Sequence, residues 1–519
     1  MKNRLETWKW LPAFLIFSVI PLTAVPLFID PYIQSKNAIL SILYLLGFSI
    51  VARDRFSAAG FSLAGYHGIL FFGFALFLST LANLDTGFHW PFWLESVSYF
   101  AGFLYFGALV SDARFWPRFQ SAVLFSATGV LLVHFYQLSM AFANETLDSR
   151  RDYASTFGEN NLLSQYLVMA FASLLTMPGR FPSFIRTAVV TVIFFNQSRS
   201  AIIGVLLLIA WQFYRDRKTN HAINLAVGAG LALCISHIAQ TRLPEQTHST
   251  FRDFSSWQVR YEVAKESLDL VRSSPFGVGP DRFQFASVSY FQDGKYKQSD
   301  RELFTNPHSE VLRLATSGGW LLAIAGLALV VQMIRLLRTV GQRKPVSVLL
   351  LIALIPEILF QFPFDIGTTV SFFLVASAAV VVTLKQNSES RWLWTLVSIC
   401  SAMLFAMGNL ALLYSGYLAR HAKTTDQAVS ACLLNPWHWQ TCELAILRLE
   451  EEANFSETKV LIDDQLRRYP NNFLALRHRS RFHFANGNVE AGCEVLKAEA
   501  QLMKGGFTAA EFSERHCVH

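Results

Sequence analysis

Two polar segments mark where this largely apolar chain could do chemistry. Asn196-Gln-Ser-Arg-Ser200 places Arg199 among other polar residues between two apolar runs. Arginine suits bidentate contact with phosphate oxygens because its guanidinium is planar and stays charged; the simpler alternative is an Arg that reaches for the membrane surface. The second segment opens with His308-Ser-Glu310. A His that is neutral near pH 7 could accept a proton from a hydroxyl nucleophile, or it could be structural. Glu310 would point away from His308 on a regular helix and is a poor orienting partner.

The elements that must position these groups are those of a membrane protein. The 519-residue chain is 52% hydrophobic and 16% charged, with 46 Phe, whereas ordinary globular proteins are about 25% charged. The charge is uneven: residues 415–519 hold 12 Lys+Arg and 13 Asp+Glu, and the first 414 residues hold 32 and 24. A membrane part is therefore followed by a soluble tail. The positive excess lies in the membrane part, where it sets orientation, and the sequence has no motif for nucleic-acid binding.

Thirteen apolar runs are long enough to cross a hydrocarbon core of about 30 Å. They lie at residues 10–29, 36–52, 64–83, 92–110, 119–140, 160–178, 183–197, 200–214, 221–239, 319–338, 346–364, 368–385 and 392–414. The first run lacks a small-residue cleavage site, which indicates an uncleaved span. With a cytoplasmic N-terminus, every compact basic cluster in a short loop falls on the cytoplasmic side. The odd number of spans then places the C-terminal tail outside. The weakest run, 183–197, is short and contains Arg186, but the basic loops downstream support it.

Ionisable residues are scarce in these spans. Glu95, His134, Arg186 and Glu357 are the visible cases, and they form no chain that would suggest a proton relay or transporter. The predicted outer side instead carries arginines that the orientation rule does not favour. They are Arg150, Arg151, Arg199, Arg242, Arg252, Arg260, Arg272, Arg282 and Arg301. A lipid-linked diphosphate would be a natural ligand for such a set.

A long loop at residues 240–318 contains several of these arginines. It is far longer than a connector between spans, and such loops are usually functional or disordered. Its residues Ser256–Arg272 have the pattern of an amphipathic helix that lies on the membrane surface or packs on the bundle, with an apolar stripe at Trp257, Tyr261, Ala264, Leu268 and Val271. Pro275-Phe-Gly-Val-Gly-Pro280 ends this helix, and Asp281–Tyr290 could form a second short element. The composition is not that of a disordered linker.

The tail has the pattern of paired helices. Pro436 and Pro470 are 34 residues apart, which is the period of tetratricopeptide (TPR) repeats. Helical patterns follow at Thr441–Glu452, Glu457–Arg468, Phe473–Ala485 and Val489–Leu502. In an extracytoplasmic compartment, Cys432 could pair with Cys442 and Cys493 with Cys517. Cys234 and Cys400 lie in spans and are expected to pack in the core.

Four units result from this organisation. They are N-terminal membrane helices at 1–239, an extracytoplasmic loop with the candidate His and Arg residues at 240–318, C-terminal membrane helices at 319–414, and an extracytoplasmic TPR-like helical domain at 415–519. The fold class is an all-α polytopic membrane protein with about 12–13 spans.

At its two polar segments the sequence resembles the superfamily of O-antigen ligases and polymerases, membrane glycosyltransferases that use glycans on undecaprenyl diphosphate. The resemblance rests on Ser198-Arg199-Ser200-Ala201, and on His308-Ser309 with Gly319 eleven residues later. Arg260 to Gly279 is similar to the family's Arg-bearing helix followed by Pro-x-Gly-x-Gly, and Gly158-Glu-Asn160-Asn161 to its Gly/Asn motif. The similarity covers roughly residues 40–385. Leu322 and Thr316-Ser317 depart from the family pattern, so the acceptor side could differ from familiar members.

The resemblance implies a GT-C-like helical bundle in the bacterial inner membrane and an inverting transfer that needs no metal or other cofactor. Arg199 and Arg260 would bind the donor diphosphate, and His308 would take the acceptor proton. Arg150, Arg151 and Arg282 would be secondary diphosphate ligands. The acceptor is left open among lipid A core, another glycan repeat, and a hydroxyl of a pilin-like protein, as in the protein O-oligosaccharyltransferases with a similar C-terminal extension.

Three hypotheses of different classes follow. The first is this glycan transfer at the periplasmic face, by a ligase or by a repeat-unit polymerase of the same superfamily. The second is a transporter of lipid-linked sugar, in which the arginines bind cargo without chemistry. The third is an assembly scaffold that recruits partners through its tail. Deletion of residues 415–519 would remove all function from the scaffold only.

Overall fold

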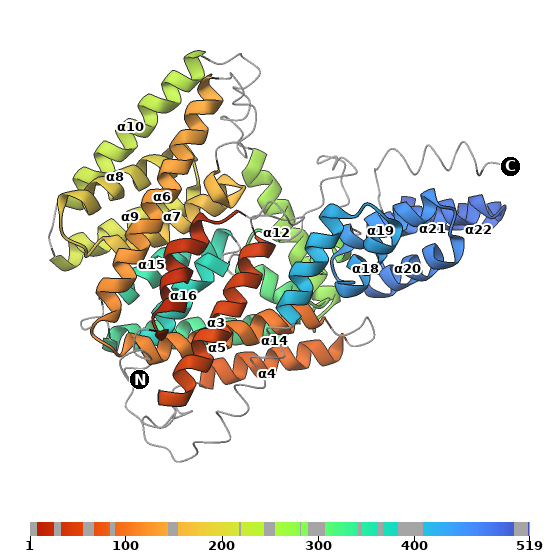
Figure 1. Ribbon diagram of the computed structural model, residues 1–519, viewed down its shortest axis with the longest axis horizontal. Helices are drawn as coiled ribbons and strands as arrows, with labels where there is room; N and C mark the ends of the chain where they lie inside the picture. The colour runs from red at the N-terminus through yellow and green to blue at the C-terminus, as the bar shows by residue number, and fades with distance from the viewer. Residues whose placement is uncertain are drawn as a thin grey trace.

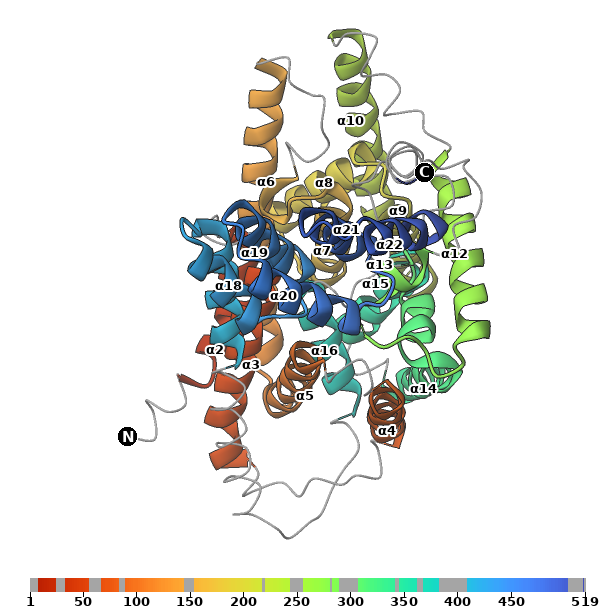
Figure 2. The same cartoon turned by 90° about the vertical axis from the view of Figure 1, so that its right-hand side faces the viewer.

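The chain is seen as a computed structural model that describes residues 8–24, 33–55, 67–83, 89–143, 154–216, 220–242, 255–280, 282–288, 307–340, 345–361, 367–381, 408–502 and 517. All regular secondary structure in these ranges is helical, which confirms the all-α prediction. Figure 1 shows a broad helical bundle from which the tail helices extend on one side. Seen from that side, the tail lies in front of the bundle (Figure 2).

The helices of the bundle coincide with twelve of the thirteen predicted runs. They are α2 (Leu11–Phe14) with its continuations η1 (Leu15–Val19) and η2 (Ile20–Leu22), α3 (Gln34–Arg55), α4 (His67–Ala82), α5 (Trp90–Val110), α6 (Phe115–Ala143), α7 (Asn160–Leu174), α8 (Arg180–Phe195), α9 (Arg199–Asp216), α10 (Asn220–Arg242), α14 (Glu310–Val340), α15 (Pro345–Phe360) and α16 (Gly367–Val381). Of the last run, only its end falls within the described ranges, where residues 408–421 are helical.

Three described helices are long and apolar enough to cross a membrane: Trp90–Val110, Phe115–Ala143 and Glu310–Gln332. Six shorter helices in the described ranges are apolar as well. These helices are those of a multi-pass membrane protein, and the orientation of its termini stays a prediction.

Helix α7 forms the centre of the bundle. Every residue of α7 except Asn161 is buried, and α6, α8, α9, α15 and α16 all pack against it. A helix that is enclosed all round must be apolar on all sides. Helix α7 nevertheless buries polar residues near its N-terminus, among them Asn160 and Ser164, and these need an explanation.

Arg186 explains why the weakest predicted run is nevertheless a helix of this bundle. Its Nη1 donates to the carbonyl oxygens of Leu174 at 2.7 Å and Met177 at 2.9 Å, at the C-terminal end of α7. The last carbonyls of a helix lack partners within the helix and carry partial negative charge, so a guanidinium there is favourable. Arg186 of α8 is therefore stabilised in its buried position by the hydrogen bonds that it donates to the C-terminal end of α7.

The tail consists of α18 (Thr425–Leu434), α19 (Trp439–Glu451), α20 (Phe455–Arg468), α21 (Phe473–Ala485) and α22 (Val489–Leu502). Each helix packs on the next. Four of them match the predicted helices closely; the sequence analysis missed α18. The disulfides Cys432–Cys442 and Cys493–Cys517 are both formed, which confirms the expected pairing.

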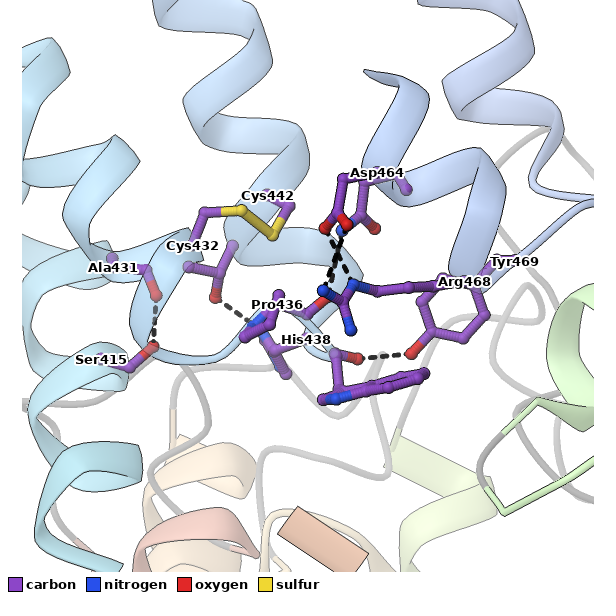
Figure 3. The surroundings of a disulfide bond; sticks show 12 residues. Ser415, Ala431, Cys432, Pro436, His438, Cys442, Asp464, Arg468 and Tyr469 are labelled. Atoms are coloured by element: carbon purple, nitrogen blue, oxygen red, sulfur yellow. Dashed lines mark hydrogen bonds and ion pairs between the residues drawn. A yellow bond between two sulfur atoms is a disulfide. The ribbon is translucent and has the colours of Figure 1, made fainter. Parts of the chain in front are cut away.

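The turns that contain the two spaced prolines are bonded to each other. Gln465 Nε2 donates to Pro436 O at 3.0 Å, and the Tyr469 hydroxyl donates to Trp437 O at 2.6 Å. Figure 3 shows the Tyr469 bond in the surroundings of the Cys432–Cys442 disulfide. The equivalent turns of the two helix pairs are thereby held in register.

Candidate active site

Arg199 is positioned by a sharp turn between α8 and α9. The turn contains Gln197, whose φ of 54° is in the left-handed region that L-residues rarely adopt. Helix α9 begins at Arg199 itself, so the half-buried guanidinium stands at the positive end of that helix. The turn is polar throughout, as predicted, and its Asn196, Ser198 and Ser200 are buried.

Ser200 connects this turn to a buried carboxylate. Its hydroxyl donates to Glu357 Oε2 at 3.0 Å, and Glu357, on α15, has no exposed surface. The two residues are 157 positions apart in the chain. Glu357 was visible in the sequence as an ionisable residue at membrane depth, but no local pattern linked it to Arg199.

Arg260 approaches the same place from the loop helix α12 (Ser255–Ser273). Burial lowers the pKa of its guanidinium, Arg199 lowers it further, and Glu357 raises it. Arg260, Arg199 and Glu357 are therefore close enough to interact electrostatically. Two cations this close repel, so each disfavours the charged form of the other.

Helix α12 confirms the helix predicted at Ser256–Arg272, and its register shows which residues face the bundle. Its buried residues are Val263, Ser267, Leu270 and Val271, whereas Tyr261 is 70% exposed and Leu268 is 37% exposed. Arg260 lies in line with this buried face, because Val263 and Ser267 follow it at i+3 and i+7. That register turns Arg260 toward the bundle.

His308 completes the cluster. It lies two residues before α14 and has a φ of 51°, a strained conformation for a non-glycine residue. Burial, followed by the charge of Arg260, lowers the pKa of its imidazole to about 4. His308 is therefore neutral at physiological pH and can accept a proton. Glu310 receives two hydrogen bonds from Arg313, at 2.8 and 2.6 Å.

Two glycine motifs hold the His308 segment against the end of α12. Val278 N donates to Thr316 O at 2.8 Å and Gly279 N to Ser317 O at 3.0 Å, while Trp320 N donates to Pro275 O at 3.2 Å. A Cβ at Gly319, which has φ 69° and kinks α14, would lie 1.9 Å from Pro275 O. A Cβ at Gly277 would lie 2.5 Å from Ser317 O. Both glycines are needed because the two backbones touch.

Three further arginines, Arg150, Arg151 and Arg282, were predicted as secondary diphosphate ligands. Arg150 and Arg151 lie outside the described residues. Arg282 is 5% exposed, donates to Val278 O at 3.5 Å, and its guanidinium lies 5.3 Å from the ring of Trp437 in the tail. It precedes α13 (Phe283–Ala286), the short element expected after α12. These contacts join Arg282 to the tail.

Trp437 is the centre of this contact between tail and bundle. Arg468 lies over its ring at 4.7 Å, and the ring of His89, at the start of α5, is 4.5 Å from it. Burial and then Arg282 lower the pKa of His89 to about 3, so it stays neutral and accepts a hydrogen bond from Phe92 N. The tail is thereby docked on the loop that carries Arg260 and His308.

Lys36 is a buried cation that the sequence analysis missed. It is 2% exposed, donates to Thr156 O at 2.6 Å and lies 4.0 Å from the ring of Phe157. In the sequence Lys36 stands at the edge of an apolar run, where an ordinary interfacial lysine is also found, so nothing in the sequence marked it as buried. It secures the start of α3 to the turn before α7.

Comparison with protein families identifies the region around this cluster. Residues 187–327 match the family model described as O-Antigen ligase. Over these residues the chain is similar to the O-antigen ligase family. The match confirms the resemblance drawn from Arg199 and His308, and it spans Arg260 and Gly319 as well. A search of curated proteins gave no match. The similarity to O-antigen ligases thus covers the segment that carries Arg199, Arg260 and His308, within a chain rich in apolar helices.

Several residues that the structure brings to the candidate site lie outside the segment matched to the O-antigen ligase family. Glu357, the buried helix α7 and the docked tail lie outside residues 187–327. Their association with the ligase domain is visible only in the folded chain.

Proposed function

We propose that this protein transfers a glycan from undecaprenyl diphosphate to an acceptor hydroxyl at the periplasmic face of the bacterial inner membrane. The observation that carries the proposal is the convergence of Arg199, Arg260 and His308 from three separate segments. Two adjacent guanidiniums suit a diphosphate, and a neutral histidine suits a hydroxyl. The O-antigen ligase match supports the same reaction class.

The diphosphate would be held by Arg199 and Arg260 before the reaction and stabilised by them during it. As the bond between the sugar C1 and the phosphate oxygen breaks, negative charge grows on that oxygen. Fixed cations at this position lower the barrier, and the loss of one such group typically costs about 10²–10³-fold in rate. The N-terminus of α9 adds partial positive charge at the same place.

His308 would act as the general base. It removes the acceptor hydroxyl proton while the oxygen attacks C1 from the face opposite the leaving diphosphate, which inverts that centre. Arg260 helps to keep His308 neutral and binds the departing group, so one residue serves both halves of the reaction. On this proposal the arginines supply the charge stabilisation that a metal ion supplies in other transferases.

The tail would present the acceptor. Its helix pairs resemble TPR hairpins in the 34-residue spacing of Pro436 and Pro470, and arrays of this kind bind peptides on a concave surface. Trp437 fixes the tail to the loop with the candidate base. A protein hydroxyl is therefore the acceptor we favour, with lipid A core and a growing glycan as the other two outcomes of the test.

The decisive experiment compares single variants in purified, reconstituted enzyme. His308→Ala, Arg199→Ala and Arg260→Ala should each abolish transfer while the protein accumulates normally. Arg272→Ala is the matched control, because Arg272 lies on the same helix as Arg260 but is exposed and pairs with Asp269. If the His308→Ala variant and the Arg199→Ala variant each transferred glycan at the normal rate, the mechanism would be contradicted.

Two further measurements separate the alternatives. Vesicles with donor and acceptor on the same outer face should yield product, whereas a transporter of lipid-linked sugar would yield none. Mass spectrometry of pilin-like proteins, lipopolysaccharide and free polymer in cells lacking the gene identifies the acceptor, because only its own pool loses glycan. Loss from the polymer pool would indicate a polymerase.

A further inference from the structure

A group of buried polar atoms beside Arg199 has no hydrogen-bond partner within the described part of the chain. The atoms are Oδ1 and Nδ2 of Asn160, Oδ1 of Asn196 and Oγ of Ser198. The three residues are 6%, 4% and 2% exposed, respectively. Buried polar groups in native proteins are nearly always satisfied, so a cluster without partners indicates a ligand or ordered water.

The packing of three helices shows that these atoms belong to one place. Deep in the bundle the junction of α7, α9 and α15 is apolar: a Cβ at Gly204 would lie 2.9 Å from the Val168 side chain and 3.4 Å from Ala353 O. One turn toward Arg199, at i±4 on each helix, the residues are Ser164, Ser200 and Glu357. The Ser200–Glu357 hydrogen bond confirms that this layer is in register.

The next turn in the same direction is polar again. It places Asn160 on α7 above Ser164, and Gln361 just beyond α15, where Gln361 N bonds to Glu357 O at 2.8 Å. Asn196 Nδ2 donates to Ser164 Oγ at 3.3 Å, which attaches the turn before Arg199 to this face of α7. The junction therefore changes from apolar to polar over two turns and ends at the candidate diphosphate ligand.

We propose that this polar junction binds the sugar that is joined directly to the donor diphosphate, with Asn160, Asn196 and Ser198 as the residues that recognise its hydroxyl or acetamido groups. The inference rests on the proposed function, because it takes Arg199 as a diphosphate ligand. Ser198 immediately precedes Arg199, so its hydroxyl is next to the position at which the first sugar would emerge. Carboxamides and hydroxyls both donate and accept, as the hydroxyls of a sugar ring require.

Ser198 is the most informative of the three. At the start of a helix a serine hydroxyl normally accepts a backbone N–H and stabilises the helix. The Ser198 hydroxyl makes no such bond, although the residue precedes α9 directly. Its replacement by alanine removes no cap, so Ser198→Ala should leave folding intact and affect only the ligand.

The test measures the binding of two kinds of lipid to the purified full-length protein in detergent. One is undecaprenyl diphosphate itself, and the other is a set of undecaprenyl diphosphates that carry a single hexose or N-acetylhexosamine. The wild-type protein should bind at least one sugar-bearing lipid more tightly than the bare lipid. Asn160→Ala, Asn196→Ala and Ser198→Ala should each reduce that preference by about five- to ten-fold, the worth of one or two hydrogen bonds. Their affinity for the bare lipid should stay unchanged.

Gln212→Ala provides a matched control. Gln212 lies on α9, is 2% exposed, and its Oε1 has no partner among the described residues. It is twelve residues beyond Ser200, about 18 Å along the helix. Its replacement removes a buried amide far from the junction and should alter neither affinity.

The outcomes distinguish this inference from the proposed function. The inference is wrong if Ser198→Ala and Asn196→Ala keep the full preference for sugar-bearing lipid, or if they lower the affinity for both kinds of lipid equally. The junction is then a water-filled structural site. A wild-type protein with no preference for any sugar also overturns it. Arg199→Ala tests the proposed function separately, because it should lower the affinity for the bare lipid and for the sugar-bearing lipids alike.

Discussion

The pH dependence of transfer offers the sharpest test of the candidate base. Burial and the charge of Arg260 lower the pKa of His308 to about 4. A general base works only in its neutral form, so kcat/KM should rise with pH through about 4 and level off above it. At pH 5.5 about 97% of such a histidine is neutral, against about 9% of a histidine with the ordinary pKa of about 6.5.

The assay is the initial rate of transfer at low donor concentration between pH 4.5 and 8. The rates at pH 5.5 and 7.5 should be nearly equal, whereas an unperturbed histidine would give a roughly ten-fold difference. The charged groups near His308 are Arg260, which stays protonated over this range, and the pair Glu310–Arg313. Arg272→Ala, on the outside of the same helix as Arg260, should leave the profile unchanged.

A midpoint near 6.5 would refute the reasoning, since it would mean that His308 is solvated and remote from Arg260. Arg260→Gln refines the test. An NMR titration of His308 in that variant should give a higher pKa than in the wild type, yet one still below 6.5, because burial is the larger cause and remains. An unchanged value would show that the two residues do not interact.

The remaining predictions concern the framework of the site. Gly319→Ala should abolish transfer, because its Cβ would collide with Pro275 O and its φ is positive; Gly230→Ala, whose Cβ would meet nothing within 4 Å, is the silent control. Full activity in Gly319→Ala would contradict the backbone contact. Trp437→Ala should undock the tail at a cost of about 3–5 kcal/mol, which limited proteolysis would detect as faster release of residues 408–502; an unchanged digestion pattern would argue against this contact. Cys432→Ser should destabilise the tail by about 2–3 kcal/mol through loss of its disulfide, visible as a lower unfolding midpoint, whereas Cys234→Ser, which removes a free thiol, should not. Equal midpoints in the two variants would refute the stabilising role.

Local patterns in the sequence were sufficient for several features. Apolar runs predict helices because a span must satisfy its own backbone in lipid, and twelve runs coincide with helices of the bundle. The two cysteine pairs were named as possible from the expected compartment, and the structure shows both bonds formed. Arg199 and His308 stood out because polar clusters are rare in such a chain.

The register of α12 shows where local patterns fail. Its apolar stripe is split: Tyr261 and Leu268 are exposed, whereas Val271 is buried together with Val263, Ser267 and Leu270. Periodicity ranks faces by hydrophobicity, but here the buried face is the one that must bring a charge to the site. Only the packing of α12 on α14 decides between the two faces.

By itself, then, the sequence determined the all-helical class, the more polar tail with its two possible cysteine pairs, and a resemblance centred on Arg199 and His308. The tertiary structure decided which polar groups meet. It brings Arg260 within electrostatic reach of Arg199 and Glu357, places Arg282 against Trp437, and stacks the polar layers of α7, α9 and α15. The physical reason is that such contacts join residues as far as 157 positions apart. They depend on how helices pack, and a pattern within one helix carries no information about its neighbours.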